Sequence, residues 1–145
     1  MNGREFVDTN IFIYAFDRSA GSKRDIGAGL LERLWSERCG CVSLQVLQEF
    51  YVTATRKLGM PAGEAARQVE RLGKWTVHRA GFEDVRSAID LHRHKRVAFW
   101  DAMILRSALS LGCTVLWTED LSDGQQWESL VIRNPFLATP GKTGR

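Results

Sequence analysis

The chain has 145 residues, which suits a single domain because a second hydrophobic core would be hard to build at this length. Hydrophobic residues make up 44% of the sequence and charged residues 26%, a balance that excludes a disordered chain. The net charge of +3 and the pI near 9.0 are compatible with a polyanionic partner but too small to indicate one alone.

The sequence contains no sign of export or of membrane insertion. Arg4 and Asp8 interrupt the first short apolar run, and no apolar run approaches the roughly 20 residues of a membrane-spanning helix. Cys39, Cys41 and Cys113 cannot all pair within the chain, and the C-x-C spacing is typical neither of redox sites nor of zinc ribbons. We therefore expect a cytoplasmic protein, with buried or incidental thiols in a reducing compartment and no membrane partner.

Capping residues and the spacing of apolar residues predict short strands that alternate with helices. In the first half of the chain the predicted elements are a strand at 5–7, helical turns over 11–16, a loop at 17–21, a helix from Ser22 (with Asp25 completing a capping box) to Gly40, a strand at 41–43, a helix from Ser43 to Gly59 and a helix from Pro61 to Leu72. In the second half they are a strand at 75–78, a helix from Phe82 into the basic run 92–96, a helix from Phe99 to Gly112, a strand at 114–117 and a weak strand at 131–132.

This alternation predicts an α/β fold in which helices cover a parallel sheet. The sequence has no internal repeat and no convincing linker, so we expect one domain over residues 1–138 and a disordered tail at 139–145. In parallel sheets of this kind, ligands bind beyond the carboxyl ends of the strands. Polar residues at those ends are therefore the first candidates for a functional site.

Five acidic residues occupy positions that could meet at this edge of the sheet. Asp8 follows the first predicted strand and Asp120 follows the last strongly apolar one, so both are expected at the same edge. Asp101 lies in the first turn of its helix, where free N–H groups and the helix dipole favour an anion. Glu49 lies beside core positions of its helix, and Asp123 follows Asp120 in the next loop.

Each of these residues also has a purely structural explanation when it is taken alone. Asp8 fits a helix cap, Asp101 a first-turn acid and Glu49 a solvated helix residue, while Asp120 and Asp123 fit turns. Together they suggest a cation, because two carboxylates about 4 Å apart repel by roughly 4 kcal/mol at an effective dielectric of about 20. Hard oxygen ligands without Cys or His suit Mg²⁺ or Mn²⁺, which proteins use to hydrolyse phosphodiesters.

Four blocks of sequence surround these acids. They are residues 6–11 (FVDTNI), 43–50 (SLQVLQEF), 99–104 (FWDAMI) and 116–121 (LWTEDL), with 123–125 (DGQ) following. In this order, over almost the whole chain, they resemble the PIN-domain family and, within it, the toxins of VapC-type toxin–antitoxin pairs. One block alone would be a weak signal, whereas four in the family's order are a specific one.

The resemblance implies a four- or five-stranded parallel sheet flanked by helices, and a Mg²⁺- or Mn²⁺-dependent ribonuclease that leaves 5′-phosphate and 3′-hydroxyl ends. It also implies a homodimer that a small antitoxin neutralises. By the same resemblance, the site residues are the catalytic metal ligands Asp8, Glu49, Asp101 and Asp120, the more variable ligand Asp123, and the supporting residues Asn10 and Thr118.

An acidic cleft that holds RNA also needs cations. The basic residues near the first loop and before the Asp101 helix are candidate phosphate contacts: Arg18, Lys23, Arg24, Arg93, Lys95 and Arg96. Residues 93–96 have a competing explanation, because cations complement the C-terminus of a helix. His92 and His94 form only an isolated H-x-H, which does not indicate zinc. Trp100 and Trp117 are expected in the core rather than as base-stacking platforms.

Other functions remain open from the sequence. A haloacid-dehalogenase-like phosphatase also uses an Asp after its first strand, but it needs a second Asp where this chain has Asn10. A response-regulator-like receiver lacks both its early acid pair and its later Lys here. A PIN nuclease of RNA processing, or a module that binds RNA or protein without cleaving, is the remaining alternative.

Overall fold

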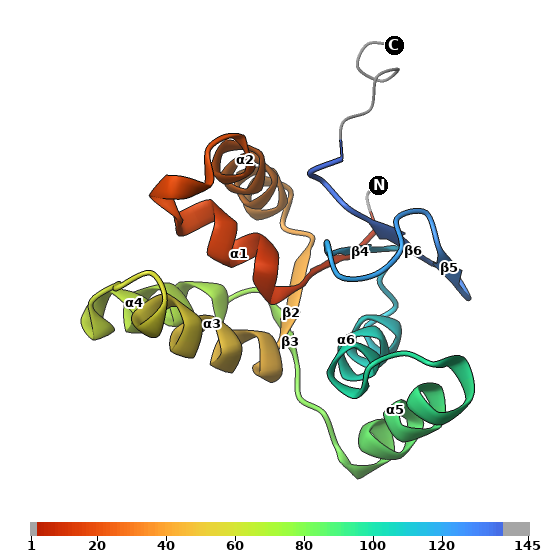
Figure 1. The fold of residues 1–145 in the computed structure, drawn as a ribbon. Helices are drawn as coiled ribbons and strands as arrows, with labels where there is room; N and C mark the ends of the chain where they lie inside the picture. Colours follow the sequence, from red (N-terminus) through yellow and green to blue (C-terminus); the bar gives the residue numbers. More distant parts are fainter. Residues whose placement is uncertain (1–2, 138–145) are drawn as a thin grey trace, which may run out of the picture.

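The computed structural model describes residues 3–137; the predicted disordered tail at 139–145 lies outside the described residues. Pairs of helices separate the first four strands along the chain, and the last two strands follow without a helix between them (Figure 1). The strands are β1 (Glu5–Val7), β2 (Gly40–Ser43), β3 (Thr76–His78), β4 (Val115–Trp117), β5 (Gln126–Trp127) and β6 (Leu130–Arg133). The helices are α1 (Thr9–Phe16), α2 (Ser22–Glu37), α3 (Leu44–Arg56), α4 (Ala62–Leu72), α5 (Phe82–Lys95) and α6 (Phe99–Ser110), with a 3₁₀ turn at Arg18–Ala20.

The strands form one mostly parallel sheet in the order β3-β2-β1-β4-β6-β5. Every neighbouring pair is parallel except β5 and β6, which are antiparallel. The predicted α/β class is confirmed. Among residues 3–137, five strands are parallel, the larger of the two numbers that the family resemblance implied. The antiparallel β5 was not predicted, because a strand of 2 residues is too short to show an alternating pattern.

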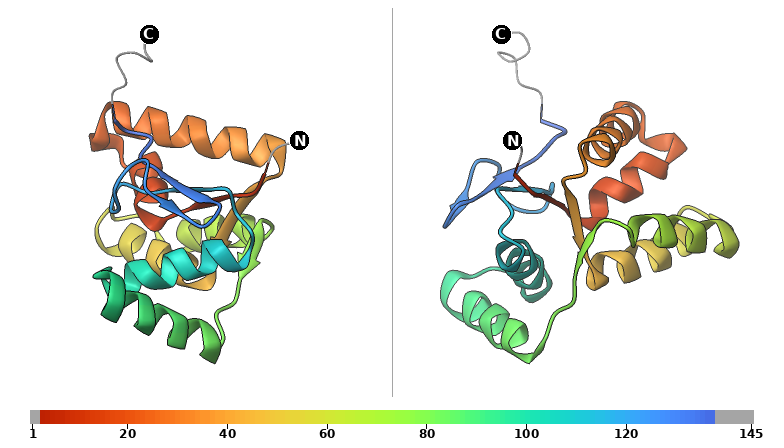
Figure 2. Two further views of the ribbon diagram at one scale, coloured as in Figure 1. Left: turned by 90° about the vertical axis from the view of Figure 1, so that its right-hand side faces the viewer. Right: turned by 180° about the vertical axis from the view of Figure 1, so that it is seen from behind.

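Helices cover both faces of the sheet. Figures 1 and 2 show α1–α4 on one side and the α5–α6 pair on the other. The middle strands are accordingly apolar on both faces, and Phe6, Val7, Leu116 and Ile132 are fully buried. A parallel strand covered on both sides has this nearly continuous apolar sequence. The core therefore fixes β1 and β4 side by side, and with them the loops that follow.

The helix starts show which local signals were interpreted correctly. Ser43 caps α3 as predicted, since its Oγ accepts a hydrogen bond from the N–H of Val46 at 3.3 Å. The predicted capping box at Ser22 is wrong: Ser22 is the first residue of α2, and Gly21 precedes it without a side-chain cap. Gly21 has a φ of 62°, a left-handed conformation that glycine adopts without strain. Backbone conformation rather than a polar side chain thus sets this helix start.

Close packing explains the residue at which β2 begins. A Cβ added to Gly40 would lie 2.6 Å from the ring of Trp75, so any side chain there would collide with the indole. Trp75 in turn lies 5.8 Å from the ring of Phe12 in α1, measured between ring centroids. The start of β2 and the Trp75 indole therefore approach each other only because position 40 has no side chain.

Two expectations about composition can be compared with the structure. The three cysteines, Cys39, Cys41 and Cys113, are free and buried, as predicted. Within residues 3–137, none of the helices combines the length and the apolar character needed to cross a bilayer.

Candidate functional site

The register of the central strands brings Asp8 to the C-terminal edge of the sheet. Val7 of β1 is paired with Trp117 of β4, and the N–H of Asp8 donates to the carbonyl of Trp117 at 3.0 Å. One oxygen of the Asp8 carboxylate accepts from the N–H of Thr9 at 2.7 Å, and the other accepts from the Thr118 hydroxyl at 2.8 Å. Asp8 is therefore the cap of α1, and it also points toward the loop after β4.

Three carboxylates from distant parts of the sequence meet at this edge. One oxygen each of Asp8, Asp101 and Asp120 lies within 4.8 Å of the other two. Asp8 ends β1, Asp101 lies in the first turn of α6, and Asp120 follows β4. Asp8 is buried, Asp101 is half-buried and Asp120 is exposed, so the cluster opens from the protein interior to solvent.

Burial and mutual repulsion both act on these carboxylates. Desolvation raises the pKa of Asp8 to about 7, and the charges of Asp120 and Glu49 add to it, against the lowering effect of its hydrogen bonds. Burial also raises the pKa of Asp101, with the same two acids contributing. Ionising this cluster at neutral pH is therefore unfavourable unless a cation lies among the oxygens.

Glu49 lies at the border of the cluster. The hydroxyl of Thr9 donates to one of its oxygens at 2.6 Å, and the amide of Gln45 donates to the other at 3.1 Å. Glu49 lines the same pocket as the three Asp residues but does not belong to their tight group. Its neighbours Leu47 and Phe50 are buried, as predicted. The carboxylate is therefore held in one orientation beside the cluster.

Asn10 and Thr118 form hydrogen bonds with the loop that carries Asp120. The amide of Asn10 donates to the Asp120 carboxylate at 3.0 Å and to the Thr118 hydroxyl at 3.4 Å. The Thr118 hydroxyl oxygen accepts from the N–H of Asp120 at 3.0 Å. Because the same hydroxyl donates to Asp8, a single fully buried side chain joins two members of the cluster.

The four predicted core acids thus line one pocket of about 430 Å³, whose walls come from α1, α3 and α6. The PIN domain family matches residues 6–122, which include all four of these acids. The chain belongs to the PIN domain family. No curated protein matches this PIN domain significantly.

Three solved structures share the fold of this PIN domain. A toxin–antitoxin complex from Klebsiella pneumoniae matches with 21% identity and a TM-score of 0.66, over 91% of this chain and 98% of that one. VapC20 of Mycobacterium tuberculosis, a toxin that cleaves the sarcin–ricin loop, matches with 20% identity and a TM-score of 0.61, over 77% and 86%. VapBC2 of Rickettsia felis, bound to a promoter DNA fragment, matches with 17% identity and a TM-score of 0.62, over 90% and 97%.

Asp123, the predicted fifth ligand, does not join the cluster in this PIN domain. Its carboxylate accepts from the N–H of Asn134 at 2.8 Å, just after β6, and it does not line the acidic pocket. The side chain is exposed and fixes the loop between β4 and β5 to the end of β6. Proximity in sequence to Asp120 was therefore a poor guide to proximity in space.

The predicted phosphate contacts fall into three groups. Lys23 is paired with Glu119 at 2.8 Å, and Arg24 lies 4.0 Å from Asp25. Arg18 is exposed and lines a pocket next to the acidic one. The basic residues at the end of α5 are exposed, but none of them lines the acidic pocket: Arg93, Lys95 and Arg96.

Trp100 was predicted in the core, and this prediction is wrong. Its side chain is 63% exposed at the N-terminal end of α6, where it lines the acidic pocket and packs against the Phe99 ring at 5.0 Å. Trp117 does pack against the core, and its indole N–H donates to Glu5 at 2.8 Å. An apolar residue type in the first turn of a helix does not reveal which way it faces.

Several polar residues of the pocket were missed by the sequence analysis. They lie on α1 and α3 or at the C-caps of these helices: Thr9, Tyr14, Asp17, Gln45, Thr53 and Lys57. A signal was present for the residues on α3, because they recur every fourth position from Gln45 to Lys57 and so share one face of the helix. Only Glu49 of that face was singled out, since it is the acidic residue of a family block.

Proposed function

We propose that this PIN domain is a Mg²⁺- or Mn²⁺-dependent endoribonuclease that acts as the toxin of a toxin–antitoxin pair. The observation that carries the proposal is the meeting of Asp8, Asp101 and Asp120 within 4.8 Å at the edge of the sheet. The three structural neighbours are toxins or toxin–antitoxin complexes, which favours a toxin over a nuclease of RNA processing. The alternative of a binding module without activity has no such support, since all four core acids are present.

The donor set fits a hard divalent ion. Carboxylate oxygens from Asp8, Asp101 and Asp120 are the ligands that Mg²⁺ and Mn²⁺ prefer, and neither Cys nor His joins the group. When bound, such an ion polarises the scissile phosphate and lowers the pKa of water beside it. Burial, with a smaller contribution from neighbouring acids, raises the pKa values of Asp8 and Asp101, and a bound cation would favour their ionised forms.

The residues around the ligands have distinct positioning roles in this proposal. Thr118 and Asn10 fix the orientation of the Asp8 and Asp120 carboxylates by direct hydrogen bonds. Partners of this kind hold ligands at the geometry that binding needs. Glu49, whose oxygens are both engaged, would contact the ion through water and help to orient the attacking water molecule.

The partners follow from the same proposal. The substrate is RNA, a small antitoxin protein neutralises the enzyme, the enzyme is a homodimer, and the setting is the cytoplasm. Support comes from the neighbours, two of which are complexes of a toxin with an antitoxin. Expression of wild-type and Asp8→Asn chains in cells, followed by sequencing of new RNA 5′ ends, would identify the target.

Cleavage of RNA by purified variants tests the activity. We expect wild-type protein to cleave structured RNA with Mg²⁺ or Mn²⁺ and to stop when a chelator is added. Asp101→Asn should lower turnover by orders of magnitude, because it removes a charged ligand of the cluster. Asp123→Asn is the matched control, since it makes the same change outside the cluster and should keep activity within a few-fold. Equal activity of wild-type and Asp101→Asn proteins would refute the proposal.

A further inference from the structure

A stripe of polar side chains leads away from the acidic cluster along α3. It consists of Gln45, Glu49, Thr53 and Lys57, four residues apart, and all of them line the acidic pocket. Side chains at this spacing lie one above another on a helix face. At a rise of about 1.5 Å per residue, Lys57 lies roughly 12 Å farther along the axis of α3 than Glu49. The pocket is therefore a groove with an acidic end and a cationic end.

The opposite wall of the groove comes from α1. Ile13, Tyr14 and Asp17 line it across from the stripe on α3. Asp17 and Lys57 also line an adjoining pocket of about 640 Å³, which contains Arg18. The two pockets thus share a border, and a path runs from the carboxylates, between α1 and α3, to Arg18.

The cations at the far end of this path are available for a ligand. The side chains of Lys57 and Arg18 are exposed, and within residues 3–137 neither forms an ion pair or a side-chain hydrogen bond. Asp17 is nearby, and its pKa is lowered mainly by hydrogen bonds from Ser19, with the Lys57 charge adding to the effect. One oxygen of the Asp17 carboxylate accepts from both the Ser19 N–H and the Ser19 hydroxyl, and within residues 3–137 the carboxylate forms no ion pair with Lys57.

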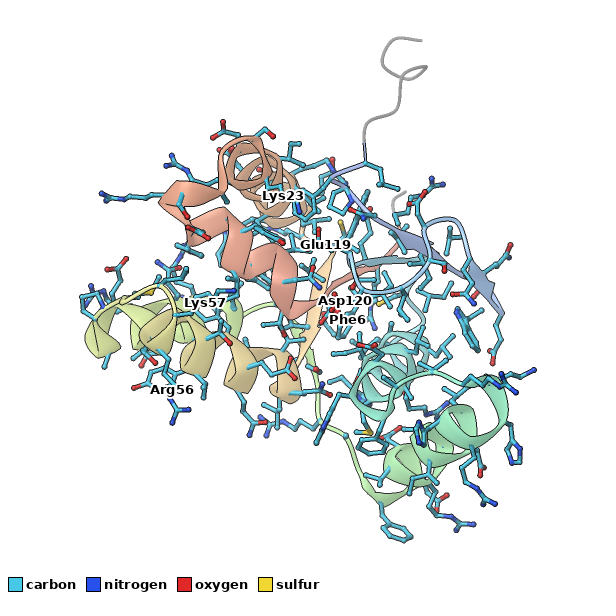
Figure 3. The ribbon with its side chains drawn as sticks, in the orientation of Figure 1. Phe6, Lys23, Arg56, Lys57, Glu119 and Asp120 are labelled. Carbon is cyan, nitrogen blue, oxygen red and sulfur yellow. The ribbon has the colours of Figure 1, made fainter. Side chains whose placement is uncertain are left out.

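Lys23 and Arg56 do not meet these conditions. Lys23 is held by Glu119 at 2.8 Å and by the Tyr14 hydroxyl at 3.4 Å, so a phosphate would have to displace existing partners. Figure 3 shows Lys57 beside the gap between α1 and α3, whereas Arg56 projects from the outer side of α3. Arg56 lines neither the acidic pocket nor the adjoining one. Two neighbouring cations of α3 therefore differ in access to the groove.

We propose that single-stranded RNA leaves the acidic centre along the groove between α1 and α3, with Lys57 and then Arg18 binding its phosphates. This inference rests on the ribonuclease function proposed above. A chain of phosphates approaching four carboxylates is repelled, and unpaired cations a short distance away offset that repulsion. Lysine and arginine contacts to phosphates hold the strand in position without reading its sequence.

The neighbouring pair Lys57 and Arg56 supplies a charge-matched test. RNA binding is measured with Mg²⁺ present in an Asp101→Asn background, so that a fluorescent single-stranded RNA is bound without being cleaved. We expect Lys57→Ala to weaken binding several-fold and to lower the slope of log K against log salt by about 0.7, the value for one phosphate contact on a single strand. Arg56→Ala removes the same charge from the outer side and should leave both quantities near the parent values.

A series of shortened RNAs separates a local contact from a general electrostatic effect. The loss of RNA affinity caused by Lys57→Ala should disappear when the RNA ends at the acidic centre and no longer reaches the C-terminal end of α3. If Lys57→Ala and Arg56→Ala behave alike, or if the loss persists with the shortest RNA, the proposed path is wrong. If those variants behave alike but wild-type protein cleaves RNA, the path is refuted and the ribonuclease function is not. If RNA binding depends on Lys57 but wild-type protein does not cleave RNA, the ribonuclease function is refuted and the RNA-binding role of the groove is supported.

Discussion

At the scale of single residues, Asp8 carries two roles that the sequence presented as alternatives. It caps α1 through the N–H of Thr9, and it also contributes an oxygen to the cluster with Asp101 and Asp120. The residue is 5% exposed, so its charge is poorly solvated. A cap alone would not need this burial or these acidic neighbours. The combination explains why the pKa of Asp8 rises to about 7 although its hydrogen bonds favour the anion.

This pKa predicts how the stability of the metal-free protein depends on pH. Asp8 titrates near 3.8 in the unfolded chain and near 7 in the folded one, so between these values the folded protein binds more protons. Raising the pH through this window therefore destabilises the fold, by up to about 4 kcal/mol at pH 8. Urea unfolding in chelator at pH 5.5 and pH 8 measures the part of this loss that falls above pH 5.5, about 2 kcal/mol. Asp8→Asn should lose most of it, and an unchanged pH dependence in that variant would contradict the assignment.

At the scale of elements, Asp84 holds together the helix pair that carries Asp101. Its carboxylate accepts from the Gly81 N–H at 2.8 Å at the start of α5, and from Arg106 of α6 at 3.1 Å. His78 of β3 lies 3.6 Å away. The pKa of Asp84 is lowered, chiefly by the Gly81 N–H and further by Arg106 and His78, so its contribution is lost only as pH falls through that lowered pKa.

Removing this carboxylate should loosen α5 against α6. We expect Asp84→Ala to lower the free energy of unfolding by about 2–4 kcal/mol, because partly buried donors lose a charged partner. Glu83→Ala is the control: its side chain is 79% exposed, and within residues 3–137 its one ion pair is with Arg86 at 3.5 Å, so the change should stay within about 0.5 kcal/mol. Denaturant unfolding of both variants measures this, and equal values would show that the Asp84 network contributes nothing.

The elements also show how far sequence reasoning reaches. Helices were predictable because their apolar spacing runs over many residues, and buried strands because they are short continuous apolar runs. Ser43 was predictable as a cap because its effect is local. The antiparallel β5 and the outward direction of Trp100 depend on tertiary packing, which no local pattern encodes. Asp123 illustrates the same limit, since a hydrogen bond to Asn134 directs it away from its sequence neighbours.

At the scale of the whole molecule, the site exists only because the sheet order places β1 beside β4. The family blocks identified Asp8, Glu49, Asp101 and Asp120, and the structure places all four around one pocket. What the blocks did not reveal is the shape of the groove, because Lys57 and Trp100 reach it through the packing of α1, α3 and α6. An acidic centre bordered by a free lysine at one end and an exposed tryptophan at the other suits a flexible, charged polymer.

The central claim is that carboxylates far apart in the sequence meet to hold a divalent cation, and Mn²⁺ titration calorimetry tests it most directly. Wild-type protein should bind Mn²⁺ and, near pH 6.5, release protons on binding, because Asp8 must ionise as the ion enters. Asp101→Asn should bind much more weakly while remaining folded, and Asp123→Asn should bind as wild type does. Folded wild-type protein that takes up no Mn²⁺, or Asp101→Asn protein that binds it equally well, would contradict the account.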